Sequence, residues 1–313
     1  MGKIAFLFPG QGSQQVGMGQ DLAEKNESSE AVFKKADERL GYALSDIIKN
    51  GPEDKLTRTE NTQPALLTTS VAILEAMGKH DIKPDYTAGH SLGEYTALVA
   101  SGALSFEDAV YAVRKRGMFM EEAVPAGKGA MAAILGMEVD ALQTITNRVT
   151  EEGDSVQLAN LNCPGQIVIS GTKEGVEKAS EIAKEEGAKR VIPLQVSGPF
   201  HSELMKPAAE KMGDVLDELT FSDAAIPVIA NVTAKPVTDA EDIKSKLIDQ
   251  IYSPVRWEET VRYLLDEGVD TFVEIGPGKV LTGLVKKVHR RATTISISDS
   301  ESLEAAVEKL KEV

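Results

Sequence analysis

The chain has 313 residues and is acidic, since 34 Lys and Arg against 49 Asp and Glu give a formal net charge of −15. This balance argues against nucleic acid as the main partner, because contacts to phosphates require an excess of cations. A 42% hydrophobic and 27% charged composition is typical of a globular protein, and the length suggests one large domain or two unequal ones.

The compartment follows from what the sequence lacks. Its single cysteine, Cys163, permits no internal disulfide, and no cluster of Cys and His has the spacing of a metal site. No apolar run approaches the ~18 residues that cross a bilayer. The apolar residues 4–8 are too few for the core of a signal peptide. We therefore expect a cytoplasmic protein with no metal and no membrane association.

The first part of the chain alternates between strands and helices. A buried strand is predicted over residues 4–8, before the PGQG turn at 9–12, and a second over 86–90. Helices are predicted over residues 21–40, 63–77, 95–100 and 105–124, with Pro64 in the first turn of the second. This alternation indicates a parallel sheet with helices on both faces.

The order of elements changes between residues 128 and 197. It becomes strand, helix, two strands, helix and strand, the βαββαβ order of a ferredoxin-like unit. Both flanking parts, 1–127 and 198–313, follow the α/β pattern. We therefore expect a discontinuous, α/β-hydrolase-like catalytic core with residues 128–197 inserted as a ferredoxin-like subdomain. In the second part of this core we predict helices to about residue 219 and over 239–251 and 255–267, strands over 228–231 and 271–275, and a final strand and helix.

The most specific motif is Gly89-His90-Ser91-Leu92-Gly93, which fits the G-x-S-x-G nucleophile elbow between a predicted strand and a predicted helix. Glycines are needed there because a sharp turn crowds any neighbouring Cβ. The Leu92 N–H comes at a helix start, where it can donate to a developing oxyanion. Ser91 is thus a candidate nucleophile, and a glycine-lined turn with an incidental serine is the alternative.

A serine hydroxyl needs a base to take its proton, so the four histidines are the next candidates. His80 lies in a polar stretch, and His289 lies in a cationic helix end. His90 adjoins the proposed nucleophile on a tight turn and points elsewhere. His201 follows the rigid turn 197–200, which could aim its ring, and we expect it to open a helix. It is the best candidate base.

Two further features bear on substrate binding. The turn at 9–12 lacks the P-loop lysine and the third glycine of the dinucleotide fingerprint, which argues against nucleotide binding there. The Gln11 N–H could instead complete an oxyanion hole, because its strand and that of Ser91 end at one sheet edge. Arg114 and Arg116 flank the apolar stripe of helix 105–124, and either could be half-buried against a carboxylate or a salt-bridge partner. The periodicity does not choose between them.

Five segments together resemble the malonyl-CoA:acyl carrier protein transacylases of bacterial type II fatty acid synthesis. They are GQGSQ at 10–14, GHSLGE at 89–94, RG at 116–117, GPFHS at 198–202 and SPVRW at 253–257. The resemblance extends over about residues 4–295. Any one segment alone would be a weak signal, whereas the five in this order and separation are specific.

The resemblance implies a Ser-His dyad in which Ser91 is acylated and His201 is the general base. It also implies that the backbone N–H groups of Gln11 and Leu92 form the oxyanion hole. A main-chain carbonyl, here that of Gln250, replaces the carboxylate of a triad in orienting the histidine.

The same resemblance assigns Arg116, rather than Arg114, to the free carboxylate of malonate. A planar guanidinium can hold a carboxylate bidentately, and acetyl would leave the buried cation unpaired. Gln63 and Phe200 are further candidates for substrate contact. The Phe200 ring would crowd an α-methyl group and so favour malonyl over methylmalonyl, although a core aromatic without substrate contact is the alternative.

The expected activity is transfer of malonyl from malonyl-CoA to the phosphopantetheine thiol of acyl carrier protein, by a ping-pong route through a malonyl-Ser91 ester. No bound cofactor is implied. Carrier proteins of this kind are acidic, as is this chain, so docking must use a local basic patch. Lys189 with Arg190 and Lys286 with Lys287 are the candidates, and ordinary solvated helix charges are the alternative.

The competing function is an esterase or thioesterase of the α/β-hydrolase type. Ser91, Asp270 and His289 satisfy its Ser…Asp…His order. The cations around His289 disfavour a further positive charge and should weaken it as a base. A non-catalytic protein that binds acyl-CoA or the carrier is a third interpretation, but it would be marked by a broken dyad or a missing arginine.

Overall fold

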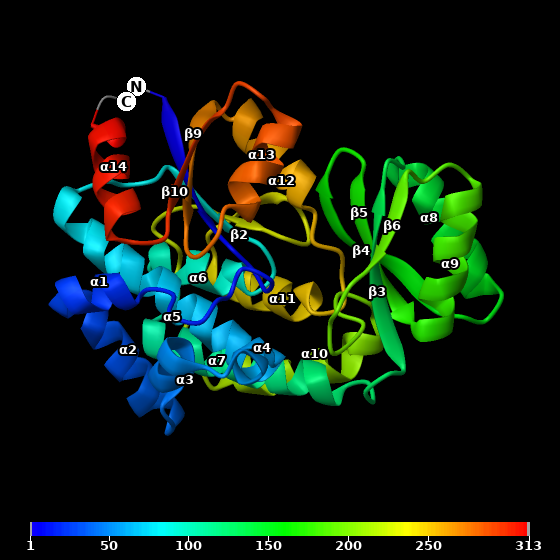
Figure 1. Ribbon diagram of the computed structural model, residues 1–313, viewed down its shortest axis with the longest axis horizontal. Helices are drawn as coiled ribbons and strands as arrows, with labels where there is room; N and C mark the ends of the chain where they lie inside the picture. Colours follow the sequence, from blue (N-terminus) through cyan, green and yellow to red (C-terminus); the bar gives the residue numbers. More distant parts are fainter. Residues whose placement is uncertain (1, 312–313) are drawn as a thin grey trace.

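The computed structural model describes residues 2–311, and two sheets organise the chain (Figure 1). The larger sheet has the strand order β10-β9-β1-β2-β7-β8, and only the β7–β8 pair is antiparallel. Its strands are β1 (Lys3–Phe8), β2 (Tyr86–Gly89), β7 (Val228–Ala230), β8 (Lys235–Val237), β9 (Val269–Ile275) and β10 (Thr293–Ile297). The α/β class with a parallel sheet is thus confirmed.

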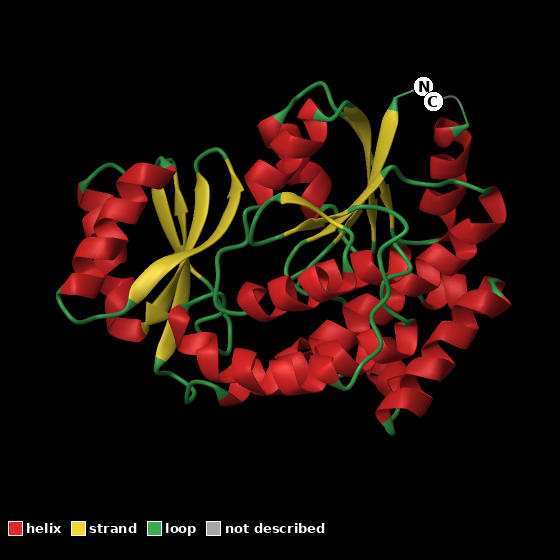
Figure 2. Ribbon diagram, turned by 180° about the vertical axis from the view of Figure 1, so that it is seen from behind, coloured by secondary structure: helices red, strands yellow, loops and turns green. Residues whose placement is uncertain are grey.

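Helices cover both faces of this sheet (Figure 2). They are α1 (Gln20–Lys25), α2 (Glu27–Leu40), α3 (Leu44–Asn50), α4 (Glu53–Thr57), α5 (Thr59–Met77), α6 (Gly93–Ala100), α7 (Phe106–Glu122), α10 (Lys206–Asp217), α11 (Ala240–Gln250), α12 (Trp257–Asp266), α13 (Val280–Val288) and α14 (Ser300–Leu310), with short 3₁₀ turns η1 (Gly78–His80) and η2 (Glu203–Met205). Side chains along β1 point alternately to the two faces of the sheet, so they contribute to two separate clusters of the core. Ala5 and Leu7 join a cluster with α12 and α13, whereas Phe6 and Phe8 join the larger cluster with α2, α5 and α7.

The smaller sheet is antiparallel, with the order β4-β5-β3-β6. Its elements follow one another as β3 (Gly129–Leu135), α8 (Val139–Glu151), β4 (Val156–Cys163), β5 (Gln166–Thr172), α9 (Lys173–Glu185) and β6 (Arg190–Pro193). Both helices pack on one face around a core of their own (Figure 2). The sheet is joined to the rest by strand-like bonds, since Leu161 N donates to Val255 O at 2.9 Å and Val255 N to Ala159 O at 2.8 Å.

Several predicted boundaries are wrong for local reasons. The helix expected over residues 21–40 is two helices, because Asn26 adopts an extended conformation and its side chain caps α2 by accepting from Ser28 N. Helices α3 and α4 and strand β8 were not expected. His201 does not open a helix; it lies in a turn with φ 57°, before η2 and α10.

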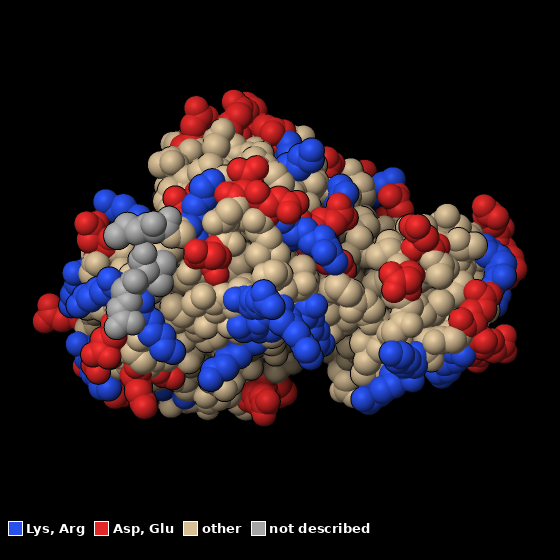
Figure 3. Space-filling model, turned by 90° about the horizontal axis from the view of Figure 1, so that it is seen from above, with Lys and Arg blue, Asp and Glu red and all other residues tan. Residues whose placement is uncertain are grey.

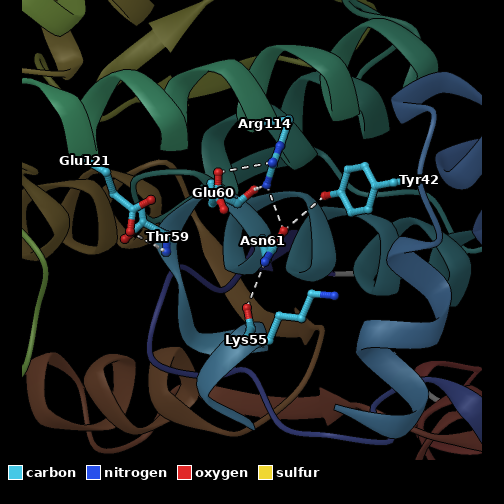
Figure 4. A network of polar contacts seen from close by, with 7 residues as sticks. All are labelled: Tyr42, Lys55, Thr59, Glu60, Asn61, Arg114 and Glu121. Carbon is cyan, nitrogen blue, oxygen red and sulfur yellow. Dashed lines mark hydrogen bonds and ion pairs between the residues drawn. The ribbon is translucent and has the colours of Figure 1, made fainter. Parts of the chain in front are cut away.

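Pro64 lies in the interior of α5, not in its first turn, because that helix begins at Thr59. A proline has no N–H, so the carbonyl of Glu60, four residues earlier, has no partner within the helix. Arg114 Nη1 on the neighbouring helix α7 donates to this carbonyl at 2.8 Å (Figure 4). A residue far along the chain thus compensates for the interruption. No helix within residues 2–311 has the length and apolar composition that crossing a membrane requires.

Candidate active site

The nucleophile elbow forms at the end of β2 and is held by close backbone contacts. Ser91 has φ 55°, a left-handed conformation that is uncommon outside glycine. A Cβ on Gly89 would lie 1.8 Å from Gly93 O, and one on Gly93 would lie 2.2 Å from Phe8 O. Both glycines of the motif are therefore required by packing, which rigidly presents the serine hydroxyl.

Ser91 and His201 are brought together from positions 110 residues apart. Ser91 Oγ lies 2.8 Å from His201 Nε2, and His201 Nδ1 lies 2.8 Å from the carbonyl oxygen of Gln250. A carbonyl only accepts, so Nδ1 carries the ring proton of the neutral imidazole and Nε2 accepts from the serine hydroxyl. Burial, and then the positive charge of Arg116, lower the pKa of His201 to about 3. The ring is therefore neutral and able to accept a proton at neutral pH.

Arg116 is fully buried on α7 and extends into the same site. Its Nη1 donates to Gln63 Oε1 at 2.8 Å, and its Nη2 donates to Gln250 Oε1 at 2.9 Å and to Ser91 Oγ at 3.0 Å. Burial lowers its pKa. Each partner is a neutral oxygen, so the guanidinium has no carboxylate in contact and its charge is available to an anionic ligand.

Two backbone N–H groups complete the site. Gln11 follows β1 and Leu92 follows β2, so both come at the carboxyl edge of adjacent parallel strands. Within residues 2–311 neither N–H donates to a protein acceptor. Gln11 and Leu92 both line a cavity of about 130 Å³. It is lined by Gln11, Gln63, His90, Ser91, Leu92, Arg116, Met120, Met131, Asn160, Leu194, Val196, Phe200 and His201.

Arg114 does not line this cavity and belongs instead to a polar network between α5 and α7 (Figure 4). It pairs with Glu60 at 3.1 Å and donates to Asn61 Oδ1 at 2.7 Å, and the Tyr42 hydroxyl donates to the same oxygen at 3.3 Å. Burial is the main reason that the pKa of Tyr42 rises to about 12. The structure thus separates the two arginines that periodicity left equivalent. Arg114 joins α5 to α7, and Arg116 faces the dyad.

Asn231 and Gln157 also support the site, and the sequence did not single them out. Asn231 Oδ1 accepts from Ser91 N at 2.8 Å, and its Nδ2 donates to Gly89 O at 2.7 Å. Gln157 on β4 donates to His201 O at 3.3 Å and accepts from Glu203 N at 2.8 Å. Asn231 ends a predicted strand at the edge where Ser91 lies, which is a signal that could have indicated it. Nothing local distinguishes Gln157.

His90 contacts the smaller sheet and lies outside the dyad. Its Nε2 lies 2.9 Å from Asn162 Oδ1 on β4, and its ring lies against Trp257 with a centroid separation of 5.5 Å. Burial lowers the pKa of His90. These contacts fit the expectation that its ring points elsewhere.

The alternative triad is wrong. Ser91 follows the carboxyl end of β2, whereas Asp270 lies at the amino end of β9. Since β2, β1 and β9 are adjacent and parallel, the two residues lie at opposite ends of these strands. Asp270 and His289 line a separate pocket of about 690 Å³ that contains no residue of the dyad.

Three of the four candidate docking residues, Lys189, Arg190 and Lys287, lie at one end of the smaller sheet. Lys287 Nζ on α13 donates to Gln166 Oε1 at 2.9 Å, and both Gln166 and Arg190 pair with Leu135 in the sheet. Lys189 precedes Arg190 in the chain, whereas Lys286 Nζ donates to Ala292 O at 2.5 Å, beyond the end of its own helix. Figure 3 shows Lys and Arg side chains gathered on the upper face of the larger part, beside the hollow that separates it from the smaller part. Within residues 2–311 no group of three or more His, Cys, Asp or Glu side chains is arranged to hold a metal ion.

Comparison with known proteins identifies the family. The model of the acyl transferase domain matches residues 5–306. The chain belongs to the acyl transferase family. Within this family it is 65% identical over 312 residues to the malonyl CoA-acyl carrier protein transacylase of Bacillus subtilis (strain 168), covering 100% of this chain and 98% of the relative.

Solved structures of the family share the fold over the whole chain. An acyl carrier protein S-malonyltransferase from Vibrio cholerae is 47% identical, with a TM-score of 0.95 over 97% of this chain and 99% of that one. A type II PKS acyl-carrier protein has been solved in complex with its malonyl-transacylase, which is 44% identical with a TM-score of 0.95, covering 98% and 99% of the two chains.

Proposed function

We propose that this acyltransferase moves malonyl from malonyl-CoA to the phosphopantetheine thiol of acyl carrier protein for fatty acid synthesis. The single observation that carries the proposal is the placement of Arg116 in the cavity of the dyad, with no carboxylate in contact with it and one nitrogen 3.0 Å from Ser91 Oγ. An acyl group that ends in a carboxylate satisfies both this guanidinium and the nucleophile. The relatives and the carrier complex described above bear the same activity in their names.

Acylation begins with the proton arrangement of the resting site. Ser91 Oγ attacks the thioester carbonyl carbon while its proton passes to His201 Nε2. Negative charge develops on the carbonyl oxygen, and the N–H groups of Gln11 and Leu92 are free to receive it. As the C–S bond breaks, the proton on Nε2 goes to the coenzyme A sulfur. The Gln250 carbonyl stabilises the imidazolium that exists in between.

Transfer to the carrier reverses these steps. The phosphopantetheine thiol gives its proton to His201 Nε2 as its sulfur attacks the malonyl-Ser91 ester, and the oxyanion again forms at the same two N–H groups. Ser91 Oγ leaves with the proton from Nε2. No cofactor takes part in this scheme, and malonyl-CoA enters only as substrate.

The cavity limits the acyl group by size and by charge. A cavity of ~150 Å³ holds benzene, which has six heavy atoms, and the malonyl acyl group also has six. The site measures about 130 Å³, with Phe200 in its wall and Gln63 beside Arg116. Both residues are thereby proposed to contact the substrate, and the Phe200 ring to disfavour an α-methyl branch.

The chain is also proposed to consist of a core and an inserted subdomain. Residues 128–197 form a ferredoxin-like inserted subdomain, which the βαββαβ order and the sheet order β4-β5-β3-β6 support. Residues 1–127 and 198–313 form an α/β-hydrolase-like core. Carrier and coenzyme A approach at the hollow between the parts, near Lys189, Arg190, Lys286 and Lys287.

Intact mass spectrometry tests the function in two steps. Mixing the protein with malonyl-CoA is expected to add one malonyl group on Ser91, and adding holo carrier protein is expected to move that group to the carrier. Ser91→Ala should take up no malonyl, and His201→Ala should acylate at least a hundredfold more slowly. A malonyl adduct that water releases but the carrier does not accept would instead identify a thioesterase.

A further inference from the structure

One buried carboxylate in the site has no part in the mechanism above. Glu94 lies on α6 and is 2% exposed. Its Oε2 accepts from Gln250 Nε2 at 2.9 Å and from Asn231 N at 3.1 Å. A buried carboxylate is costly unless it is well bonded, and the partners of Glu94 are an amide and a backbone N–H rather than a cation. Its presence directly behind the dyad therefore requires an explanation.

The Gln250 side chain connects this carboxylate to the arginine. Its Nε2 donates to Glu94 and also to Ser91 O at 2.9 Å, while its Oε1 accepts from Arg116 Nη2 at 2.9 Å. The Ser91 carbonyl oxygen can only accept hydrogen bonds, and Glu94 Oε2 already accepts from Asn231 N, so the NH₂ end of the amide must face Ser91 and Glu94. The amide oxygen must then face the guanidinium. If the amide were flipped, its NH₂ group would lie against Arg116 Nη2. Both groups are donors, so no hydrogen bond could form between them.

We infer that Glu94 is a positioning residue for Arg116, because it holds the Gln250 amide with its oxygen toward the guanidinium and thereby sets the preference for acyl groups that carry a free carboxylate. The inference rests on the proposed malonyl transfer. The main chain of Gln250 contacts His201 and its side chain contacts Arg116, so substitution of the side chain leaves the carbonyl that orients the base in place.

The use of an amide between the two charges has a physical advantage. A carboxylate in contact with Arg116 would compete with the carboxylate of the substrate for the same nitrogens. The amide oxygens of Gln63 and Gln250 accept from Nη1 and Nη2 of Arg116 without neutralising the positive charge. Glu94 is separated from Arg116 by the Gln250 amide. It therefore fixes the orientation of this amide and leaves the guanidinium available to the substrate carboxylate.

Single-turnover acylation by malonyl-CoA and by acetyl-CoA, followed by intact mass, tests the inference through the ratio of the two rate constants kcat/KM. Glu94→Leu and Gln250→Met remove the relay and are expected to lower the malonyl-to-acetyl ratio about 10- to 100-fold, the effect of losing a hydrogen bond to a charged group. Glu94→Gln keeps an acceptor oxygen and is expected to change the ratio less than about threefold. Most of the loss should be in KM for malonyl-CoA.

Glu60→Gln is the matched control, because it removes a carboxylate beside Arg114 on the other side of the same helix pair and should leave the ratio unchanged. An unchanged ratio in a folded Glu94→Leu protein overturns the inference, and so does a Glu94→Gln protein that loses as much as Glu94→Leu. If Glu94→Leu does not fold, Gln250→Met decides by the same ratio. Failure of the wild type to form a malonyl ester overturns the proposed function and this inference together, whereas a malonyl ester with unchanged ratios overturns this inference alone.

Discussion

At the scale of single residues, burial sets the chemistry of the site. His201 and Arg116 are taken out of water beside one another, and the pKa of each is lowered chiefly by that burial. A histidine with a pKa of about 3 is neutral throughout the physiological range, so the resting site needs no change of protonation before it reacts. The ring proton of His201 is on Nδ1, because the Gln250 carbonyl oxygen beside that nitrogen can only accept a hydrogen bond.

The first prediction concerns the pH dependence of acylation. Because the pKa of His201 lies far below 6.5, the rate of single-turnover acylation by acetyl-CoA should show no acid limb near pH 6.5 in the wild type. Arg116→Ala removes a positive charge that lowers this pKa, so its acid limb should move upward, while burial and the neighbouring His90 still hold it below 6.5. Quenched-flow rates from pH 4.5 to 8.5 measure both. A wild-type limb centred at 6.5 would contradict the prediction.

The second prediction uses Glu94, whose burial raises its pKa from 4.5 to about 7. Its folded pKa lies above its unfolded one, so the folded state binds the proton more tightly. This contribution to stability is fully present below about pH 4.5 and is lost as pH rises through about 7. Glu94→Gln cannot titrate. We therefore expect the free energy of unfolding of Glu94→Gln, relative to wild type, to increase from pH 5 to pH 8 by on the order of 3 kcal/mol.

Denaturant unfolding of both proteins at several pH values measures this difference, and subtracting one from the other removes the contribution of the other titrating groups. A difference that stays constant from pH 5 to pH 8 would mean that Glu94 ionises in the folded protein as it does in water.

Single residues also show where the sequence was and was not informative. The elbow motif and the rigid turn before His201 indicated two side chains that the structure brings together, whereas Arg116 was assigned only by the resemblance to a family. Gln157 and Asn231 were missed because their importance depends on partners in distant parts of the chain, such as Glu203 and Ser91. Periodicity could place Arg114 and Arg116 at the edge of an apolar stripe but could not say which of them reaches Ser91.

At the scale of elements, the pairing of α5 with α7 positions the Arg116 side of the cavity. Gln63 and Arg116 come from these two helices and bond to one another at 2.8 Å. The helices approach so closely that a Cβ on Gly117 would lie 2.7 Å from Thr59 O and 2.8 Å from Glu60 Cα. The start of α5 was predicted too late because proline usually favours a first turn, and the arginine that makes Pro64 tolerable is fifty residues away.

The third prediction follows from that close approach. Gly117→Ala must push α7 away from backbone atoms that cannot rotate aside, so we expect a loss of about 1–3 kcal/mol in the free energy of unfolding. The shift also moves Arg116 relative to Gln63, so KM for malonyl-CoA should rise more than kcat falls. Thermal unfolding and steady-state kinetics measure the two effects.

Gly283→Ala is the matched control for this prediction. Gly283 lies within α13, and a Cβ there meets nothing within 4 Å. The substitution should therefore stabilise the helix by about 0.5–1 kcal/mol and leave the kinetics unchanged. If Gly117→Ala changes stability and kinetics no more than Gly283→Ala does, α5 and α7 can accommodate an added Cβ and the prediction is wrong.

At the scale of the whole molecule, the active site depends on the seam between the two sheets. His90, Gln157 and the backbone around Val255 connect the core to β4, so the smaller sheet supports His201 as well as forming a wall of the cavity. The order of elements predicted this second unit, because strand and helix periods are local. The bonds across the seam were not predictable, since they join residues with no common motif.

The last prediction concerns the approach of the carrier. The chain carries a net charge of −15, so an acidic partner is repelled at long range and must be guided by a local patch. If the end of α13 is that patch, the double variant Lys286→Glu with Lys287→Glu should raise KM for the carrier about tenfold at low salt, with little change in acylation by malonyl-CoA.

The difference between this variant and the wild type should shrink as salt is raised to 0.5 M, because the Debye length falls to ~4 Å. Lys34→Glu with Lys35→Glu on the exposed face of α2 changes the net charge equally at a distant place and is the control. Stopped-flow transfer from preformed malonyl enzyme to carrier measures each variant. Equal effects of the two double variants would assign the slowing to net charge and would leave the end of α13 without a role in docking.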